Sequence, residues 1–416
     1  MLRRPDSEAS EEISLGYPGW RVVGACFLAA VFCWGFGLYG HGVYLAELHR
    51  LHGWSTTQIS SATTAFYLLT AALVAFVSTA IAKLGPRRVM LIGAACFGGA
   101  VALLAVITEL WQLYIAYLVM AVGAASMHVG SISNVIGLWF SEKRALALSL
   151  ALNGASSGGI LVTPLLVLAI AHFGFANAML GSALLFAVLL LPVIALWIDR
   201  PPQDTATTTA APAAAPIWTR QRALRSPAFW SVAAPFAMAL TAQVGFLVHQ
   251  VAFLQPMLGR AQAGFAVAVL TVSAIAGRLM LGAIAPRIDV RRFTAWSLAS
   301  QAAALLAMIW TGEAWALYVA CAVYGLSAGN LITLPSLVIQ REFEAASFGM
   351  LVALSWAITQ FTYAFGPGLL GVIRDASGDY AAALGFCIAL KIVAAVLILV
   401  RPKEDVLAQT SLTDFR

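Results

Sequence analysis

The chain has 416 residues, of which 61% are hydrophobic and only 10% are charged, and its formal net charge is +6. A soluble domain of this size cannot bury so much apolar surface, so lipid must be the solvent for much of the chain. The cations lie in short clusters between apolar runs, which argues against nucleic acid as a partner. All five cysteines fall inside apolar segments without a CxxC pair, so we expect no disulfide framework, metal or cofactor.

Apolar stretches long enough to cross a hydrocarbon core of about 30 Å occur in two sets of six. The first set covers residues 20–46, 57–82, 88–108, 111–138, 144–171 and 177–198. The second set covers residues 227–255, 263–285, 293–311, 314–338, 347–373 and 380–400. We therefore predict an all-α membrane protein with twelve transmembrane helices in two six-helix halves.

The boundaries of the two halves follow from this pattern. We place the N-terminal half at 20–200 and the C-terminal half at 227–400, with polar tails at 1–19 and 401–416. Residues 201–226 join the halves, and their Pro/Ala/Thr-rich beginning is typical of a flexible tether.

The basic residues predict the orientation of the helices. Of the 24 Lys and Arg residues, nineteen lie on the side of the two termini if both termini share one face. The opposite face keeps only Arg50, Arg260 and Arg374, and Arg278 and Lys391 lie within helices. The positive-inside rule therefore predicts cytoplasmic termini and a cytoplasmic linker.

Short sequence matches link the two halves. Ala80-Ile-Ala82 recurs as Ala283-Ile-Ala285, and Ser133-Asn-Val-Ile136 recurs as Ser336-Leu-Val-Ile339, both at an offset of 203 residues. This pattern favours a parallel internal repeat, and such a repeat predicts a ligand site near mid-membrane between the halves.

Arg278 is the residue that the hydrophobic pattern explains least. It precedes the basic turn at the end of its helix by about seven residues, which is roughly 10 Å of helix. A guanidinium in hydrocarbon costs at least about 2.5–3.5 kcal/mol, so it needs a partner, a cavity or a task. We interpret Arg278 as a fixed positive charge for an anionic substrate; the alternative is a residue that snorkels or supports a helix interface.

Several motifs resemble the major facilitator superfamily, and in particular its monocarboxylate transporters and oxalate–formate exchangers. They are Leu84-Gly-Pro-Arg-Arg88, Gly53-Trp-Ser55, Trp139-Phe-Ser-Glu-Lys-Arg-Ala-Leu-Ala147 and Gly277-Arg278. The resemblance covers nearly the whole chain and implies the major facilitator fold. It also implies that Arg278, by its position in the eighth helix, binds a substrate carboxylate.

The sequence departs from those families at several charged positions. Acidic residues usual near the basic loops are replaced by Ala82 and Pro286, and Ala274 stands where monocarboxylate transporters commonly carry Asp. Neither 22–46 nor 347–373 contains the lysine that the respective relatives use there. One fixed cation favours a monoanion over a dianion.

Other polar residues within the helices are candidates for the site. His128 would suit a proton-linked step, or it is a neutral imidazole bonded to a backbone carbonyl. His41 and His249, which the repeat pairs, are candidate gating residues, with interfacial packing as the alternative. The residues that could shape the cavity, or equally make helix–helix contacts, are Tyr67, Asn153, Gln243, Asn330, Gln360, Tyr363 and Trp34.

Two charged residues have other expected roles. Glu47 lies at the outer end of the first helix, where we expect it to be solvated. Lys391 is near the centre of the last helix, about ten residues or roughly 15 Å from either end, so its side chain cannot easily reach water. A structural partner or a lipid contact is the leading interpretation for Lys391.

Together these observations predict a secondary active transporter that moves a small organic monoanion across the plasma membrane by alternating access. In a Gram-negative bacterium this would be the inner membrane. The sequence is compatible with proton coupling and with anion exchange. We expect the protein to be functional as a monomer. The alternatives are an exporter of larger amphipathic compounds and a membrane sensor without transport. An enzyme is not expected, because no nucleophile–base pair or metal-ligand cluster appears.

Overall fold

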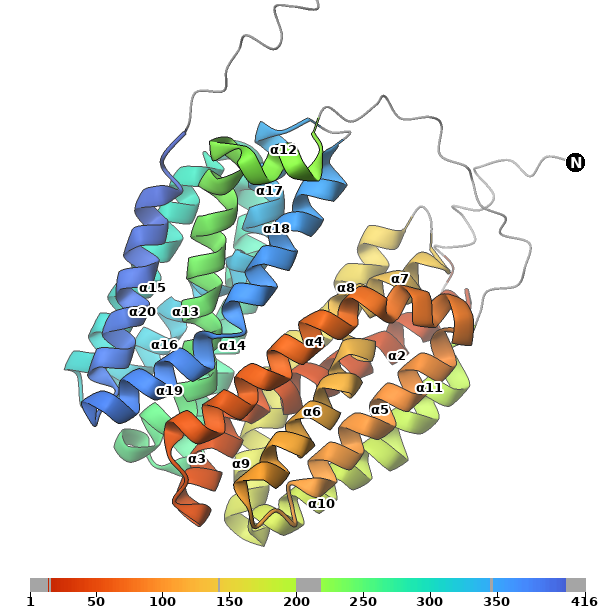
Figure 1. Ribbon diagram of the computed structural model, residues 1–416, viewed down its shortest axis with the longest axis vertical. Helices are drawn as coiled ribbons and strands as arrows, with labels where there is room; N and C mark the ends of the chain where they lie inside the picture. The colour runs from red at the N-terminus through yellow and green to blue at the C-terminus, as the bar shows by residue number, and fades with distance from the viewer. Residues whose placement is uncertain (1–13, 15, 141–142, 200–217, 345–346, 402–416) are drawn as a thin grey trace, which may run out of the picture.

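The computed structural model describes residues 14, 16–140, 143–199, 218–344 and 347–401. The predicted tails up to residue 13 and from residue 402, and the linker at 200–217, lie outside the described residues. Within the described ranges, every regular element is a helix (Figure 1).

The helices of the N-terminal half form six spans, several of which are interrupted. These elements are α2 (Gly19–Phe32), η1 (Cys33–Tyr39), α3 (Gly40–His52), α4 (Thr56–Leu84), α5 (Pro86–Leu103), α6 (Leu110–Met127), α7 (Val129–Gly137), α8 (Arg144–Ser157), η2 (Gly158–Val162), α9 (Thr163–Phe173), α10 (Phe175–Leu185), η3 (Phe186–Leu190) and α11 (Leu191–Trp197).

The C-terminal half follows a short helix and repeats this arrangement. Its elements are α12 (Arg220–Arg225), α13 (Pro227–Leu258), α14 (Arg260–Ile284), η4 (Ala285–Arg287), α15 (Val290–Trp310), α16 (Ala314–Ala328), η5 (Gly329–Ile332), α17 (Leu334–Glu342), α18 (Phe348–Tyr363), α19 (Gly366–Ser377) and α20 (Ala381–Leu397).

The predicted membrane fold is confirmed. Eleven spans in the described ranges are long and apolar enough to cross a membrane, and the shorter apolar helix α20 makes twelve. Large apolar side chains cover the outer faces, including Phe76 (69% exposed), Leu196 (76%) and Trp296 (76%). Such faces need a nonpolar solvent. The side of the membrane on which the termini lie stays a prediction.

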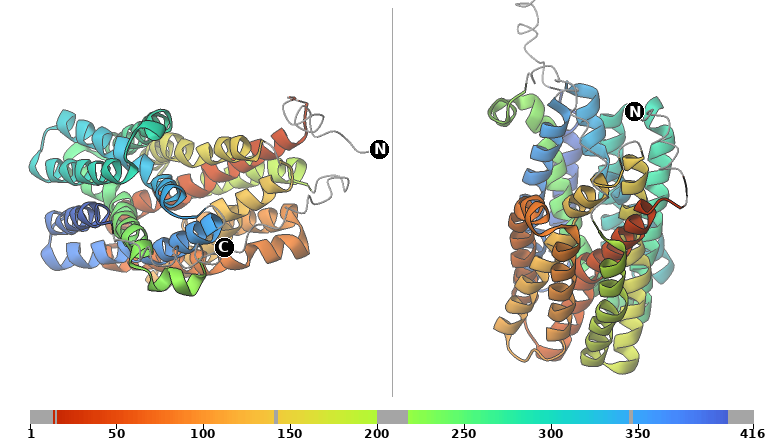
Figure 2. Two further views of the ribbon diagram at one scale, coloured as in Figure 1. Left: turned by 90° about the horizontal axis from the view of Figure 1, so that it is seen from above. Right: turned by 90° about the vertical axis from the view of Figure 1, so that its right-hand side faces the viewer.

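The two halves lie side by side as separate bundles (Figures 1 and 2). They converge at the end that carries α3, α9 and α19, where α4 packs on α19, α3 on α13 and α9 on α14. We call this the closed end. Toward the opposite end, which carries α7, α12 and α17, the ribbons of the halves diverge (Figure 1).

Two of the sequence motifs form the turns between spans. Gly53 ends α3 in the left-handed region at φ 68°, which favours glycine. Ser55 then begins α4 with a capping box, in which its hydroxyl accepts from Gln58 N at 3.1 Å and Gln58 Oε1 accepts from Ser55 N at 2.9 Å. Gly85, at φ 86°, makes the next reversal before Pro86 opens α5.

The internal repeat is visible in matching hydrogen bonds. Tyr114 donates to the Gln58 carbonyl at 3.3 Å, and Tyr318 donates to the Gln262 carbonyl at 3.3 Å, so both members of the pair recur 204 residues later. The two spans that hold these tyrosines are also interrupted at equivalent places, between α6 and α7 and at η5. The stretches predicted at 111–138 and 314–338 are therefore each interrupted, at His128 and at η5.

Close helix packing inside each half depends on glycine. A Cβ on Gly158 would lie 2.6 Å from the Val31 carbonyl oxygen, and one on Gly277 would lie 1.9 Å from the Leu326 carbonyl oxygen. Backbones approach closely where no side chain intervenes, as is usual in membrane helix pairs. These contacts place η2 against α2 and α14 against α16.

We predict that Gly277→Ala destabilises the protein while Gly282→Ala, in the same helix, does not. A Cβ at position 277 forces α14 and α16 apart, and overpacking typically costs about 1–3 kcal/mol. Nothing lies within 4 Å of a Cβ at position 282. Thermal unfolding in detergent measures both variants; equal midpoints would contradict the assigned helix contact.

Candidate functional site

Arg278 lies where α14 of the C-terminal half meets α8 of the N-terminal half. We call this contact region around Arg278 and Ser156 the junction. Arg278 follows Arg260, at the closed end of α14, by eighteen residues, or about 27 Å of helix. Its Nη2 donates to the Ser156 hydroxyl on α8 of the other half, and its Nε donates to the Ala274 carbonyl at 3.4 Å. Among the described residues, no Asp or Glu forms an ion pair with Arg278.

Glycines bring the helices of this junction together. A Cβ on Gly154 would lie 2.1 Å from the Phe27 carbonyl oxygen, so α8 packs directly on the backbone of α2. A Cβ on Gly159 would lie 2.7 Å from Thr271 Oγ1 and 2.8 Å from the ring of Tyr39. The first, fifth and eighth spans therefore meet around η2, one turn from Ser156.

Aromatic side chains flank the junction. Trp34, which is half-buried on η1, stacks on His128 with ring centroids 5.5 Å apart. His128 has an extended backbone at the break between α6 and α7, and its Nδ1 has no hydrogen-bond partner among the described residues. Tyr67 of α4 meets Tyr363 of α18 edge to face at 5.6 Å, which is a contact between the halves.

Two predicted residues lie on accessible faces of the spans. Asn153 is exposed on α8, one turn before Ser156, and Gln360 is half-exposed on α18. Their side chains are accessible to a ligand or to solvent.

Two other predicted residues are buried inside the C-terminal half. Gln243 Nε2 donates to the Ala328 carbonyl at 3.5 Å, and Asn330 Nδ2 donates to the Leu326 carbonyl at 3.2 Å. The side-chain oxygens of both lack a partner among the described residues. Gln243 thus links α13 to α16, whereas Asn330 bonds its own span, and the described contacts join neither to Arg278.

The two candidate gating histidines are each enclosed within one half. His41 is fully buried among rings, with Phe66 and Tyr117 each 4.6 Å away between centroids. His249 is also fully buried, bonded to the Pro367 carbonyl at 2.9 Å and to the Tyr380 hydroxyl at 3.2 Å. His249 thus connects α13 to α19, and within the described ranges neither imidazole hydrogen-bonds to the other half.

Polar contacts across the closed end were not predicted. Glu47 is only 3% exposed, contrary to the expected solvation, and accepts from Arg50 at 2.9 Å. Arg260 of the other half pairs with Glu47 at 3.2 Å. The pair borders a very small cavity of about 10 Å³ between the halves, which Val43 also lines.

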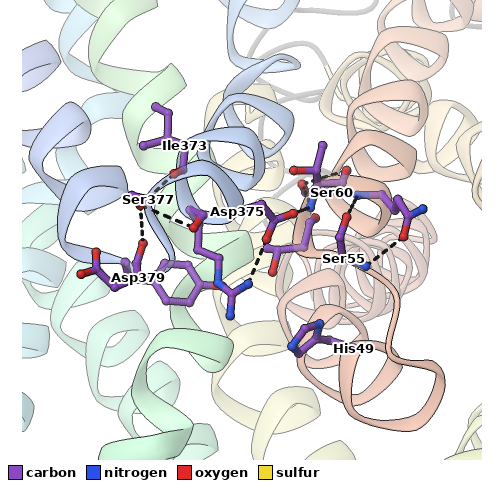
Figure 3. Close-up of polar contacts among 12 residues, drawn as sticks. His49, Ser55, Ser60, Ile373, Asp375, Ser377 and Asp379 are labelled. Atoms are coloured by element: carbon purple, nitrogen blue, oxygen red, sulfur yellow. Dashed lines mark hydrogen bonds and ion pairs between the residues drawn. The ribbon is translucent and has the colours of Figure 1, made fainter.

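A second contact joins the halves at this end. Asp375 Oδ2, near the end of α19, accepts from Thr57 N at the start of α4 at 2.6 Å (Figure 3). Arg374 pairs with the other carboxylate oxygen of Asp375 at 2.9 Å. A carboxylate is a favourable partner for the free N–H groups of a helix N-terminus.

Lys391 lies away from the junction. It is fully buried in the C-terminal half, where its Nζ donates to Gln301 Oε1 at 2.5 Å and to the Ala239 carbonyl at 3.4 Å. The Tyr324 ring lies 5.2 Å from Nζ. Lys391 therefore has a structural partner inside the bundle, as the leading interpretation expected.

Two bundles of membrane-spanning helices with a polar contact region between them are the architecture of a membrane transporter built from two halves. A model of the Major Facilitator Superfamily matches residues 26–354. The chain therefore belongs to the Major Facilitator Superfamily of transporters.

Named relatives and solved structures show the same kinship. The chain is 26% identical to monocarboxylate transporter 11 of Mus musculus, over 89% of this chain and 84% of the relative. It is 25% identical to MFS-type transporter 1 of Ophiocordyceps sp., over 82% of this chain and 76% of the relative. A bacterial homologue of the human lysosomal transporter Spinster, in an inward-facing and occupied conformation, has the same fold, with a TM-score of 0.64, 13% identity and 99% coverage of both chains.

We predict that Glu47→Gln loosens the closed end. The substitution removes the charge that holds Arg260, and a loss of about 1 kcal/mol in the free energy of closing raises the open population about fivefold. The rate at which a thiol reagent labels Val43→Cys in the cavity reports this opening, in a Cys96→Ala background. Glu313→Gln, an exposed acid without a described ion pair, is the control. Equal labelling rates in the parent, Glu47→Gln and Glu313→Gln proteins would show that the Glu47–Arg260 ion pair does not hold the closed end together.

Proposed function

We propose that this protein is a secondary transporter of a small organic monoanion and that Arg278 binds the carboxylate of its cargo. The observation that carries the proposal is the charge balance at the junction. Arg278 is half-buried between the halves, and its described partners are a neutral hydroxyl and a backbone carbonyl. A guanidinium in such a place is uncompensated, and a carboxylate is its geometrically matched partner.

The surroundings of Arg278 support a monoanion. Lys391, the other cation deep in the described spans, is fully buried and held by Gln301, so the junction offers one fixed charge. The rings of Trp34, Tyr67 and Tyr363 supply apolar surface for the body of the cargo. The name of monocarboxylate transporter 11 agrees with this cargo class.

The separation of the two halves supports alternating access. We infer that the closed end faces the outside and the diverging end the cytoplasm, because the basic residues cluster toward the termini. The solved relative is described as inward-facing, which supports the same state here. In our proposal the monomer works in the plasma membrane and the halves rock about Arg278.

The coupling step has two candidates. His128 stacks on Trp34 of η1, and its Nδ1 has no hydrogen-bond partner among the described residues, so a proton taken there would accompany the anion. Exchange of one anion for another needs no such group. We do not assign the coupling step to a carboxylate of the protein, because Glu47 and Asp375 lie at the closed end, away from Arg278.

We predict that monocarboxylates stabilise the purified protein and that Arg278→Ala strongly reduces this effect. A ligand at a hundredfold excess over Kd raises the stability of the native state by about 2.7 kcal/mol. Losing hydrogen bonds to a charged group weakens binding by about 10- to 100-fold. Thermal unfolding measures this with acetate, lactate and benzoate, and with oxalate and succinate as dianions.

The matched control is Lys391→Met, which removes the other membrane cation. This variant should respond to monocarboxylates as the parent does, relative to its own ligand-free midpoint. An unchanged response in folded Arg278→Ala would make Arg278 a structural residue. Stabilisation only by larger amphipathic compounds would favour the exporter.

A further inference from the structure

Ser156 differs from many of the other hydroxyl residues of the spans. Several of these donate to the carbonyl four residues earlier in their own helix, as Ser60, Thr70, Ser182, Thr241, Thr271 and Thr294 do. Its neighbour Ser157 does the same, with a bond of 3.1 Å to the Asn153 carbonyl. Ser156 makes no such bond, although it is only 4% exposed.

The described partner of Ser156 is Arg278, in the other half. The guanidinium donates through Nη2, so the serine oxygen is the acceptor. Because α8 belongs to the N-terminal half and α14 to the C-terminal half, this hydrogen bond crosses the junction. It lies away from the closed end, where the halves are already held by Glu47, Arg260 and Asp375.

The nitrogen that Ser156 uses is also the one a carboxylate needs. A guanidinium binds a carboxylate through two parallel N–H groups, either Nε with Nη2 or Nη1 with Nη2. Both arrangements include Nη2. Nη2 carries two N–H groups and Nη1 makes no described hydrogen bond, so a carboxylate can approach while Ser156 is bound and then compete with the serine oxygen for Nη2.

We propose that Ser156 is a stand-in ligand for Arg278, which the cargo carboxylate displaces. This inference rests on the proposed function, because the displacing group is the anion. In the empty transporter, Ser156 accepts a hydrogen bond from the guanidinium without neutralising its charge, and this bond ties α8 to α14. When the carboxylate takes the guanidinium, this tie between the halves is broken, and binding is thereby linked to the movement of one half against the other. Ser156 is thus a positioning residue that lowers affinity and couples binding to gating.

The first test needs no ligand. Unfolding midpoints of Ser156→Ala, Arg278→Ala and the double variant form a double-mutant cycle. The hydrogen bond predicts that the losses are not additive, so that Ser156→Ala costs little once Arg278 is absent. Additive losses would overturn the assigned contact, whatever the cargo is.

The second test measures binding of acetate, lactate and benzoate by concentration-dependent thermal stabilisation, with sodium chloride as the ionic-strength control. Removing a competing hydrogen bond should tighten binding to Ser156→Ala by about three- to tenfold. Ser157→Ala is the matched control and should bind as the parent does.

The outcomes separate the two proposals. Weaker binding to Ser156→Ala would make the serine a ligand of the cargo, and binding equal to that of Ser157→Ala would remove any role; either overturns displacement. Parent-like binding to Arg278→Ala, or no binding of any carboxylate to the parent, would instead overturn the proposed function.

Discussion

The close approach of helix backbones at glycine is the constraint on which the rest of this structure depends. Gly154 and Gly158 let the fifth span lie against the backbone of the first, and Gly277 lets α14 lie against α16. A single added Cβ at these positions would meet a carbonyl oxygen within 2.6 Å. These contacts fix where α8 and α14 face each other, and therefore where the Arg278 guanidinium can find a partner.

Charge is distributed very differently at the two levels of the interface between the halves. At the closed end, Glu47 and Asp375 each have charged partners, and their contacts cross from one half to the other. At the junction, Arg278 has only neutral acceptors among the described residues. Glu47 and Asp375 are thus both paired with arginines in this state, while Arg278 at the junction has no acidic partner among the described residues. An anion would therefore be attracted electrostatically to Arg278.

Hydropathy is sufficient to predict twelve spans in two sets, because lipid imposes a length on each apolar span. The major facilitator fold itself is predicted from the resemblance of the motifs. Arg278 stood out from hydropathy as well, as a charge that hydrocarbon penalises. Its partner could not be predicted, because Ser156 is 122 residues away and serine in a helix usually bonds its own turn. The predicted solvation of Glu47 is wrong because Arg260, which pairs with Glu47, approaches it only once the halves have packed. Gln243 and Asn330 could be named as polar residues, but sequence alone does not show that they face their own half.

The measurement that tests the central claim most directly is exchange across a membrane. Proteoliposomes preloaded with unlabelled lactate should accumulate labelled lactate through the parent protein. Equal amounts of reconstituted Arg278→Ala should show no accumulation above empty vesicles, while Lys391→Met should retain it. Exchange by Arg278→Ala at the parent's rate would contradict the account, because the carboxylate would then be bound elsewhere.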